Sequence, residues 1–176
     1  MKKGFSLIEL IVVIAITAVL LAVALPNLLS ARERARDAKR KQEAQEMKSA
    51  LRLYYTDHQA YPPGGSGGMG KLNYISGCGT DAVSLCPCVS GTTTVDFAAG
   101  TACENIYMKR FPSEFGSNTI NYHQGVTGSD DFCIDALLEN AGDPDTYDNL
   151  TAKGKTPCVS ACGSYCSGTK YCLCSD

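Results

Sequence analysis

The sequence predicts an α+β fold: one long N-terminal α-helix with an apolar first half, followed by a small antiparallel β-sheet head with disulfide-rich loops. Three observations support this fold class. Residues 5–58 contain neither a glycine nor, apart from Pro26, a proline, as expected of an extended helix. Two short apolar runs at 120–123 and 132–140 flank turn-forming residues, which indicates a hairpin. All ten cysteines lie between Cys78 and Cys174.

The first half of the predicted helix is long enough to cross a membrane. Residues 10–31 carry no charge, and 22 helical residues span ~33 Å, against ~30 Å for a bilayer core. An ordinary signal peptide, with Lys2 and Lys3 as its basic start and cleavage near Ala24, would also be apolar here, as would a plain signal anchor. Neither alternative explains Glu9, because a carboxylate in lipid costs about 2.5–3.5 kcal/mol.

The N-terminal residues Lys2-Lys3-Gly4-Phe5-Ser6-Leu7-Ile8-Glu9 resemble the leader and first mature residues of type IV pilins and type II secretion pseudopilins. This resemblance implies a type IV pilin-like fold, whose strands pack on the long helix. It also implies that a prepilin peptidase cuts between Gly4 and Phe5, and that Phe5 is then N-methylated. Glu9 takes the place of the family's glutamate, and Pro26 matches its helix-breaking proline.

Cleavage at Gly4 would leave a positive amine on Phe5 that needs a partner in a helix bundle. Glu9 of a neighbouring subunit could pair with it or accept from free N–H groups at the helix start. Glu9 would thereby set the register of assembly. The partners implied by the resemblance are identical or related pilin subunits in a helical homopolymer, the prepilin peptidase and the pilus assembly machinery.

The charges that flank the apolar segment bear on its orientation. Six Lys or Arg residues lie within 32–41, and the positive-inside rule alone would place that side in the cytoplasm. Ten cysteines instead fit an oxidising compartment, and the leader implies a cytoplasmic N-terminus. We therefore expect a single-pass protein of the cytoplasmic membrane that becomes part of an extracellular filament at the cell surface.

The second half of the helix is amphipathic. Ala44, Met47, Leu51 and Tyr54 follow the 3, 4, 3 spacing of one buried face. The charged residues of 32–48 are interpreted as a solvated face with pairs such as Asp37–Lys41, with a lipid- or DNA-binding basic patch as the alternative. The predicted organisation is a leader at 1–4, a membrane or filament-core helix at 5–31, an amphipathic helix at 32–60 and a Cys-rich head at 61–176.

The start of the head is marked by Pro62 and Pro63, which end the helix. The helix exit from Leu53 to Pro62 resembles that of pilins and major pseudopilins. The glycine-rich segment 64–70 predicts a flexible loop. Segments 107–112 and 120–140 also resemble the family loosely, and the latter predicts an antiparallel hairpin around residues 128–131.

The cysteines allow three interpretations. An even number in an exported chain favours disulfides of unassigned pairing. One alternative is redox chemistry at Cys86 and Cys88 or at Cys172 and Cys174. The other is metal binding by the thiolates of Cys158, Cys162, Cys166, Cys172 and Cys174. The sequence has no Cys-x-x-Cys pair, which weakens both alternatives. The candidate disulfide residues are Cys78, Cys86, Cys88, Cys103, Cys133, Cys158, Cys162, Cys166, Cys172 and Cys174.

A second candidate metal site is a carboxylate cluster of Asp143, Asp145 and Asp148. Major pseudopilins bind calcium in a late loop, so calcium is one interpretation, and an ordinary polar turn is the other. We expect no other cofactor. His58 and His123 have no evident catalytic partners and are interpreted as a helix-exit and a strand residue.

The function predicted is a non-enzymatic structural subunit, a pilin, of a type IV pilus-like filament. A type II secretion pseudopilin is the first alternative. A secreted disulfide-rich binding domain released by an ordinary signal peptidase, and an exported redox enzyme that uses Cys86 and Cys88, are the others.

Overall fold

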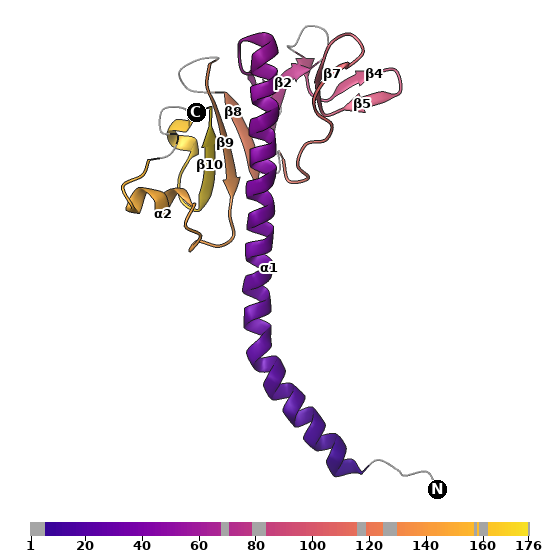
Figure 1. The fold of residues 1–176 in the computed structure, drawn as a ribbon, viewed down its shortest axis with the longest axis vertical. Coiled ribbons are helices and arrows are strands. Elements are labelled where there is room, and N and C mark those ends of the chain that lie inside the picture. Colours follow the sequence, from indigo (N-terminus) through magenta and orange to yellow (C-terminus); the bar gives the residue numbers. More distant parts are fainter. Residues whose placement is uncertain are drawn as a thin grey trace. The chain divides into compact units, whose positions relative to one another are not determined.

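The computed structural model describes residues 6–67, 71–78, 84–115, 119–124, 130–156, 158 and 162–175. The chain divides into two compact units, Met1–Arg36 and Asp37–Asp176, and each is described by itself. Helix α1 (Leu7–His58) supplies residues to both (Figure 1). The predicted long N-terminal helix is confirmed, and it ends four residues before Pro62.

In the first unit, α1 is continuous through Pro26. The sequence allowed a kink or local melting there, since proline cannot donate the helical hydrogen bond. The helix does not melt there, and Figure 1 shows that its axis bends in the N-terminal part. Two polar side chains just beyond Pro26 bond to the helix backbone. Asn27 Nδ2 donates to the Val23 carbonyl at 3.5 Å, and Ser30 Oγ donates to the Asn27 carbonyl at 3.2 Å.

In the second unit, the central sheet has the order β10 (Lys170–Cys174), β9 (Phe132–Leu137) and β8 (Ile120–Gln124), all antiparallel. Strands β8 and β9 confirm the predicted hairpin, with Ile120 opposite Ala136 and Gln124 opposite Phe132. Residues 128 and 129 of the expected turn lie outside the described residues. Strand β10, which the sequence did not predict, makes β9 the central strand.

A second sheet contains β1 (Gly64–Gly67), β2 (Lys71–Cys78) and β3 (Ser84–Leu85) in that order. The prediction of a flexible loop is wrong for Gly64–Gly67, which pair antiparallel with β2. Strand pairing uses only backbone groups, so it does not need side chains. Glycine in a strand often marks a place where another backbone segment comes close. A Cβ at Gly64 would lie 3.2 Å from the Gln124 amide nitrogen of β8.

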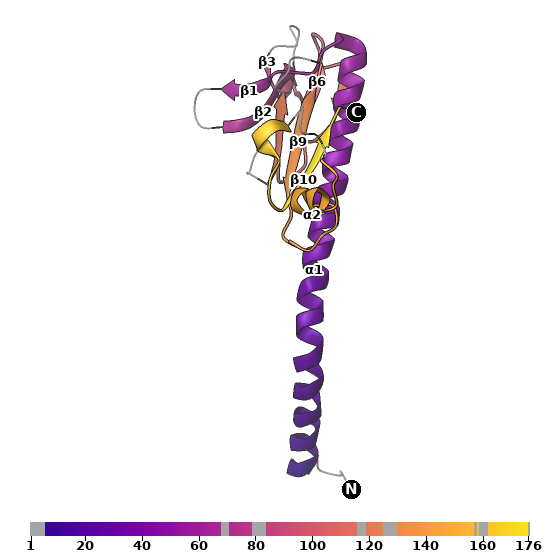
Figure 2. The ribbon, with the colours of Figure 1, turned by 90° about the vertical axis from the view of Figure 1, so that its left-hand side faces the viewer.

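Two small ribbons complete the β structure. Strand β4 (Cys88–Ser90) pairs with β5 (Thr93–Val95), and β6 (Phe97–Ala99) pairs with β7 (Asn105–Met108), both antiparallel. Helix α2 (Tyr147–Ala152) and the 3₁₀ turn η1 (Gly163–Tyr165) lie between β9 and β10 in the sequence. In Figure 2 the strands lie on one side of the C-terminal part of α1.

The predicted buried face of α1 is confirmed, since Ala44, Met47, Leu51 and Tyr54 are all buried. They belong to one core cluster with residues of β2, β6, β8 and β9. Successive side chains of a strand point to opposite sides, and the first five residues of β9 are all buried. Strand β9 is therefore buried on both faces. Phe132, Ile134 and Ala136 join this core, whereas Cys133 belongs to a separate cluster with three other cysteines.

Candidate assembly surface

The apolar part of α1 exposes its side chains. The large hydrophobic residues from Leu7 to Leu29 are between 50 and 74% exposed, and none of its most apolar 18-residue stretch is buried. In length and composition the helix is sufficient to cross a membrane. Exposed apolar surface of this extent marks a contact with a membrane or another protein.

The polar side chains of this segment differ in how they are satisfied. Thr17 Oγ1 donates to the Ile14 carbonyl at 3.0 Å, and Asn27 and Ser30 also bond to the helix backbone. Such bonds lower the penalty of a polar group in an apolar medium. Glu9 is the acidic residue of the first turn, where free N–H groups and the helix dipole favour a negative charge. Gly4 and Phe5 lie outside the described residues.

A buried carboxylate begins the second unit. Asp37 is only 1% exposed and accepts the backbone N–H groups of Glu139 and Asn140, both at 2.9 Å. It also pairs with Arg40 Nη1 at 3.3 Å. The prediction that this part of the helix is a solvated face is wrong at Asp37, because the carboxylate fixes the segment that follows β9.

Arg40 extends the same network. Its guanidinium pairs with Glu114 and Glu139, each at 2.8 Å, and donates to the Leu137 carbonyl at 3.2 Å. Burial alone would lower the pKa of Arg40, but these carboxylates raise it above its ordinary value. The fork of a guanidinium suits several acceptors at once, so Arg40 ties α1 to two segments of the head.

Lys41 does not form the predicted pair with Asp37. Its Nζ contacts Asp143 Oδ1 at 2.5 Å and Asp145 Oδ2 at 2.8 Å. Burial would raise the pKa of Asp143, but the hydrogen bond and charge of Lys41 lower it. Asp148 Oδ1 instead accepts the Gly168 N–H at 3.1 Å. Two of the three proposed calcium ligands thus contact an ammonium group, and the described residues contain no group of three potential metal-binding side chains.

The cysteines form two separate sets of disulfides. The N-terminal disulfide set is Cys78–Cys86 and Cys88–Cys103. The C-terminal disulfide set is Cys133–Cys162, Cys158–Cys174 and Cys166–Cys172. No cysteine is free, and Cys86 and Cys88 bond to different partners. A redox pair formed by Cys86 and Cys88 is therefore not present in this fold.

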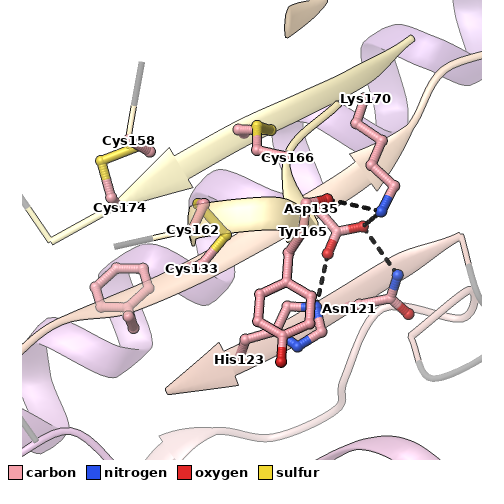
Figure 3. The surroundings of a disulfide bond; sticks show 12 residues. Asn121, His123, Cys133, Asp135, Cys158, Cys162, Tyr165, Cys166, Lys170 and Cys174 are labelled. Carbon is pink, nitrogen blue, oxygen red and sulfur yellow. Dashed lines mark hydrogen bonds and ion pairs between the residues drawn. A yellow bond between two sulfur atoms is a disulfide. The ribbon is translucent and has the colours of Figure 1, made fainter. Parts of the chain in front are cut away.

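A polar cluster lies beside the C-terminal disulfide set (Figure 3). Asp135, 1% exposed, contacts His123 Nε2 at 2.8 Å, Asn121 Nδ2 at 3.0 Å and Lys170 Nζ at 3.1 Å. Burial would raise the pKa of Asp135, but these three partners lower it. The His123 ring stacks on Tyr165 with 3.8 Å between centroids. Sequence reasoning missed this cluster, although alternation along the hairpin placed Asn121, His123 and Asp135 on one face.

His58 also has partners that the sequence did not indicate. Its ring stacks on Tyr54 one helical turn earlier, with 4.2 Å between centroids, and its Nε2 lies 3.1 Å from the Tyr107 hydroxyl. Tyr107 Oη donates to Asp57 at 3.0 Å. These contacts fix the end of α1 against β7 and serve the packing of the head.

A long N-terminal helix with an exposed apolar half, followed by a disulfide-linked head of small antiparallel sheets, is the type IV pilin-like α+β fold. The sequence comparisons agree with this class. Residues 1–25 match the family model described as the prokaryotic N-terminal methylation motif. The match includes Gly4, Phe5 and Glu9, so it covers the N-terminal residues that resemble the leader and first mature residues of pilins. No solved structure matches the chain.

Three curated relatives represent two kinds of assembly. The "type IV wide pilus major component PilA4" of Thermus thermophilus is 69% identical over 35 residues, which are 20% of this chain and 27% of that protein. A "fimbrial protein" of Neisseria meningitidis is 33% identical over 62% of this chain and 64% of its own length. The "type II secretion system core protein G" of Escherichia coli is 28% identical over 86% of this chain and 81% of its own.

These matches confirm the resemblance to type IV pilins and type II secretion pseudopilins. The chain spans about a quarter and about two thirds of the first two relatives. The short match to the Thermus protein is much more identical than the longer ones, as expected if similarity is concentrated in one segment. None of the three names denotes an enzyme.

Proposed function

We propose that this protein is a structural subunit of an extracellular type IV pilus-like filament. The observation that carries the proposal is the methylation motif on a helix whose apolar side chains are exposed over several turns. Once the segment has left the bilayer, packing between neighbouring helices keeps this surface out of water, where its exposure would cost about 25 cal/mol per Å² of apolar area. The head contributes the outer surface of the filament.

Before assembly the subunit is held in the cytoplasmic membrane with its N-terminus in the cytoplasm. A prepilin peptidase cuts after Gly4, and Phe5 becomes the N-methylated first residue. The segment 5–31 then leaves the bilayer and packs against identical or related subunits, moved by the pilus assembly machinery. The bonds of Thr17, Asn27 and Ser30 to their own helix suit both environments.

Glu9 is the assembly residue in this proposal. The positive amine of Phe5 on one subunit pairs with the Glu9 carboxylate of its neighbour, which fixes the axial register. Removal of one member of a buried pair leaves an uncompensated charge and is strongly destabilising. Helix α1 is continuous at Pro26 in the single subunit. In the assembled filament, Pro26 is the place where the helix would locally melt, because proline lacks the N–H group for the helical hydrogen bond.

The test compares two substitutions on the same helix. Glu9→Ala should leave membrane insertion and leader cleavage unchanged but reduce surface filaments at least tenfold, measured by shearing and immunoblotting. Glu33→Ala removes an exposed carboxylate further along α1 and should leave filaments at the wild-type level. Normal filaments from Glu9→Ala would contradict the proposed role of Glu9.

A type II secretion pseudopilin is the second candidate. It is favoured by the long match to core protein G, which covers most of both chains. The two candidates separate in a strain that lacks this gene: a pilin is required for long surface filaments, whereas a pseudopilin is required for export of secreted proteins. Loss of export with filaments unchanged would select the second candidate.

A further inference from the structure

The two disulfide sets differ in the order in which they join the cysteines. The N-terminal disulfide set pairs each cysteine with the next one along the chain. In the C-terminal disulfide set, Cys133–Cys162 crosses Cys158–Cys174, and Cys166–Cys172 is nested inside the latter. If the last six cysteines paired in sequence order, none of these three disulfides would form.

From this order we infer that the head is a substrate for a thiol–disulfide isomerase, which must act before the protein reaches its native pairing. An oxidase that acts on cysteines as they become available joins each one to the next free thiol in the sequence, and a cysteine that is still free pairs most readily across a short loop. For Cys158 the native separation is 16 residues, whereas Cys162 is four residues away. Loop-closure entropy scales as 1.5 ln n, so this ratio favours the wrong partner by roughly eightfold.

Proximity in the fold does not by itself select the native partner of each cysteine. Cys133 and Cys174 lie directly opposite each other as partners in the β9–β10 ladder, yet each is bonded elsewhere. Figure 3 shows Cys133–Cys162 and Cys158–Cys174 side by side at this sheet, with Cys166 close to them. Cross-strand partners have Cα atoms about 4.5–5.5 Å apart, within the range of a disulfide. A partly folded head therefore holds a non-native pair at bonding distance.

Because most cysteines of the C-terminal disulfide set are buried in the folded head, an isomerase can exchange their disulfides only before folding is complete. Cys133 and Cys162 are fully buried, and Cys166, Cys172 and Cys174 are at most 7% exposed. An isomerase cannot reach these sulfur atoms once the head has closed, so exchange must precede folding. After closure the same burial protects the native pairs from reduction.

The exchange can be written with all electrons balanced. Each disulfide initially forms when a pair of thiols gives two electrons and two protons to the disulfide of an exported dithiol oxidase. Sequence-order pairing then gives Cys133–Cys158, Cys162–Cys166 and Cys172–Cys174. The isomerase thiolate attacks Cys162, which forms a mixed disulfide and releases the Cys166 thiolate.

Three further exchanges complete the cycle without net oxidation. The Cys166 thiolate attacks Cys172, which forms the native Cys166–Cys172 bond and releases Cys174. The Cys174 thiolate attacks Cys158, which forms Cys158–Cys174 and releases Cys133. The Cys133 thiolate attacks Cys162 of the mixed disulfide, which forms Cys133–Cys162 and returns the isomerase thiolate. Each step is the ordinary attack of a thiolate on a disulfide.

Two double variants give a matched test, because each removes one disulfide of the crossed pair. With Cys158→Ser and Cys174→Ser, the remaining cysteines pair natively in sequence order. With Cys133→Ser and Cys162→Ser, Cys166–Cys172 remains, but sequence-order pairing would still be non-native. The inference predicts that only the first variant becomes independent of the isomerase.

The experiment oxidises the reduced full chain in detergent with a purified dithiol oxidase, with or without a purified thiol–disulfide isomerase, and maps the disulfides by mass spectrometry. We expect the isomerase to raise the native fraction of the C-terminal disulfide set at least fivefold in the wild type; random pairing of six cysteines gives about one in 15. The N-terminal disulfide set, as internal control, should form equally in both reactions. Full native pairing of the wild type with oxidase alone would overturn the inference, whatever the variants do. Equal isomerase dependence of the two variants would also overturn it, since departure from sequence order would then not be the cause.

Discussion

The N-terminal and C-terminal parts of helix α1 have the same secondary structure but opposite relations to their surroundings. In Leu7–Arg36 the large apolar side chains are exposed, and the side chains of Thr17, Asn27 and Ser30 bond to the helix itself. In the part from Asp37 onward, one face is buried in a core, and charged residues that include Asp37, Arg40 and Lys41 are bonded to the head. Helix formation alone therefore does not tell the role of a segment. The role depends on whether other residues of the same chain contact the side chains of that segment. The first part requires partners from outside the chain, and the second does not.

The same substitution in the two parts gives the largest expected contrast. Leu51 is fully buried, whereas Leu20 is 65% exposed. Leu51→Ala should lower the free energy of unfolding of the head by about 2–5 kcal/mol. Leu20→Ala should leave it within about 0.5 kcal/mol of wild type, as measured by denaturant unfolding in detergent. An equal loss in both variants would mean that the two parts do not differ as described.

The buried carboxylate at the start of the head gives the next effect. Asp37→Ala leaves the N–H groups of Glu139 and Asn140 without their acceptor, and we expect a loss of about 2–4 kcal/mol. Glu33→Ala, one helical turn earlier, serves as the exposed control. Calorimetry of both variants measures the difference, and a silent Asp37→Ala would show that the docking of the segment after β9 depends on packing alone.

The polar cluster at Asp135 predicts a dependence on pH. Because the folded-state pKa of Asp135 is lowered, its stabilising contribution is fully present above the unfolded-state pKa of about 3.9. It decreases as the pH falls from there through the folded-state pKa. Asp135→Asn should cost about 1–3 kcal/mol at pH 7 and flatten the loss of stability below pH ~4.

Urea unfolding at a series of pH values measures this dependence, with Asp130→Asn, an exposed turn residue, as the control. If Asp135→Asn kept the full acid dependence of the wild type, other carboxylates would have to account for it.

The smallest effect concerns Lys41 and calcium. Lys41→Met removes the ammonium between Asp143 and Asp145 and should lower stability by about 1 kcal/mol, because the ion pair is only partly buried. Lys39→Met, whose side chain is 63% exposed, should have less effect. Since the Lys41 ammonium already pairs with Asp143 and Asp145, calcium or a chelator should leave the thermal midpoint of the wild type unchanged. A calcium-dependent rise would restore the interpretation of Asp143, Asp145 and Asp148 as metal ligands.

Sequence reasoning succeeded where a pattern was local. The length of α1, its buried face at Met47 and Leu51, and the β8–β9 hairpin all follow from residue types over short spans. The methylation motif is equally local, and it identified Glu9 as unusual without any structure.

Sequence reasoning failed where the partner is distant in the chain. Asp37 looks like an ordinary charge on a helix, and its partners are 102 and 103 residues away. Gly64–Gly67 were assigned to a loop because their pairing with β2 involves the backbone alone. The disulfide pairing could not be predicted, since ten cysteines permit many combinations and the sequence did not predict strands such as β10, which carries Cys172 and Cys174.

The most direct test of the account is the N-terminus of the protein recovered from sheared surface filaments. If Leu7–Arg36 is a subunit contact retained after export, mass spectrometry should find a mature chain that begins with N-methylated Phe5 and keeps the entire apolar segment. A soluble chain beginning at Leu25, with no filaments at the cell surface, would contradict the account, because the exposed apolar helix would then be a discarded signal peptide.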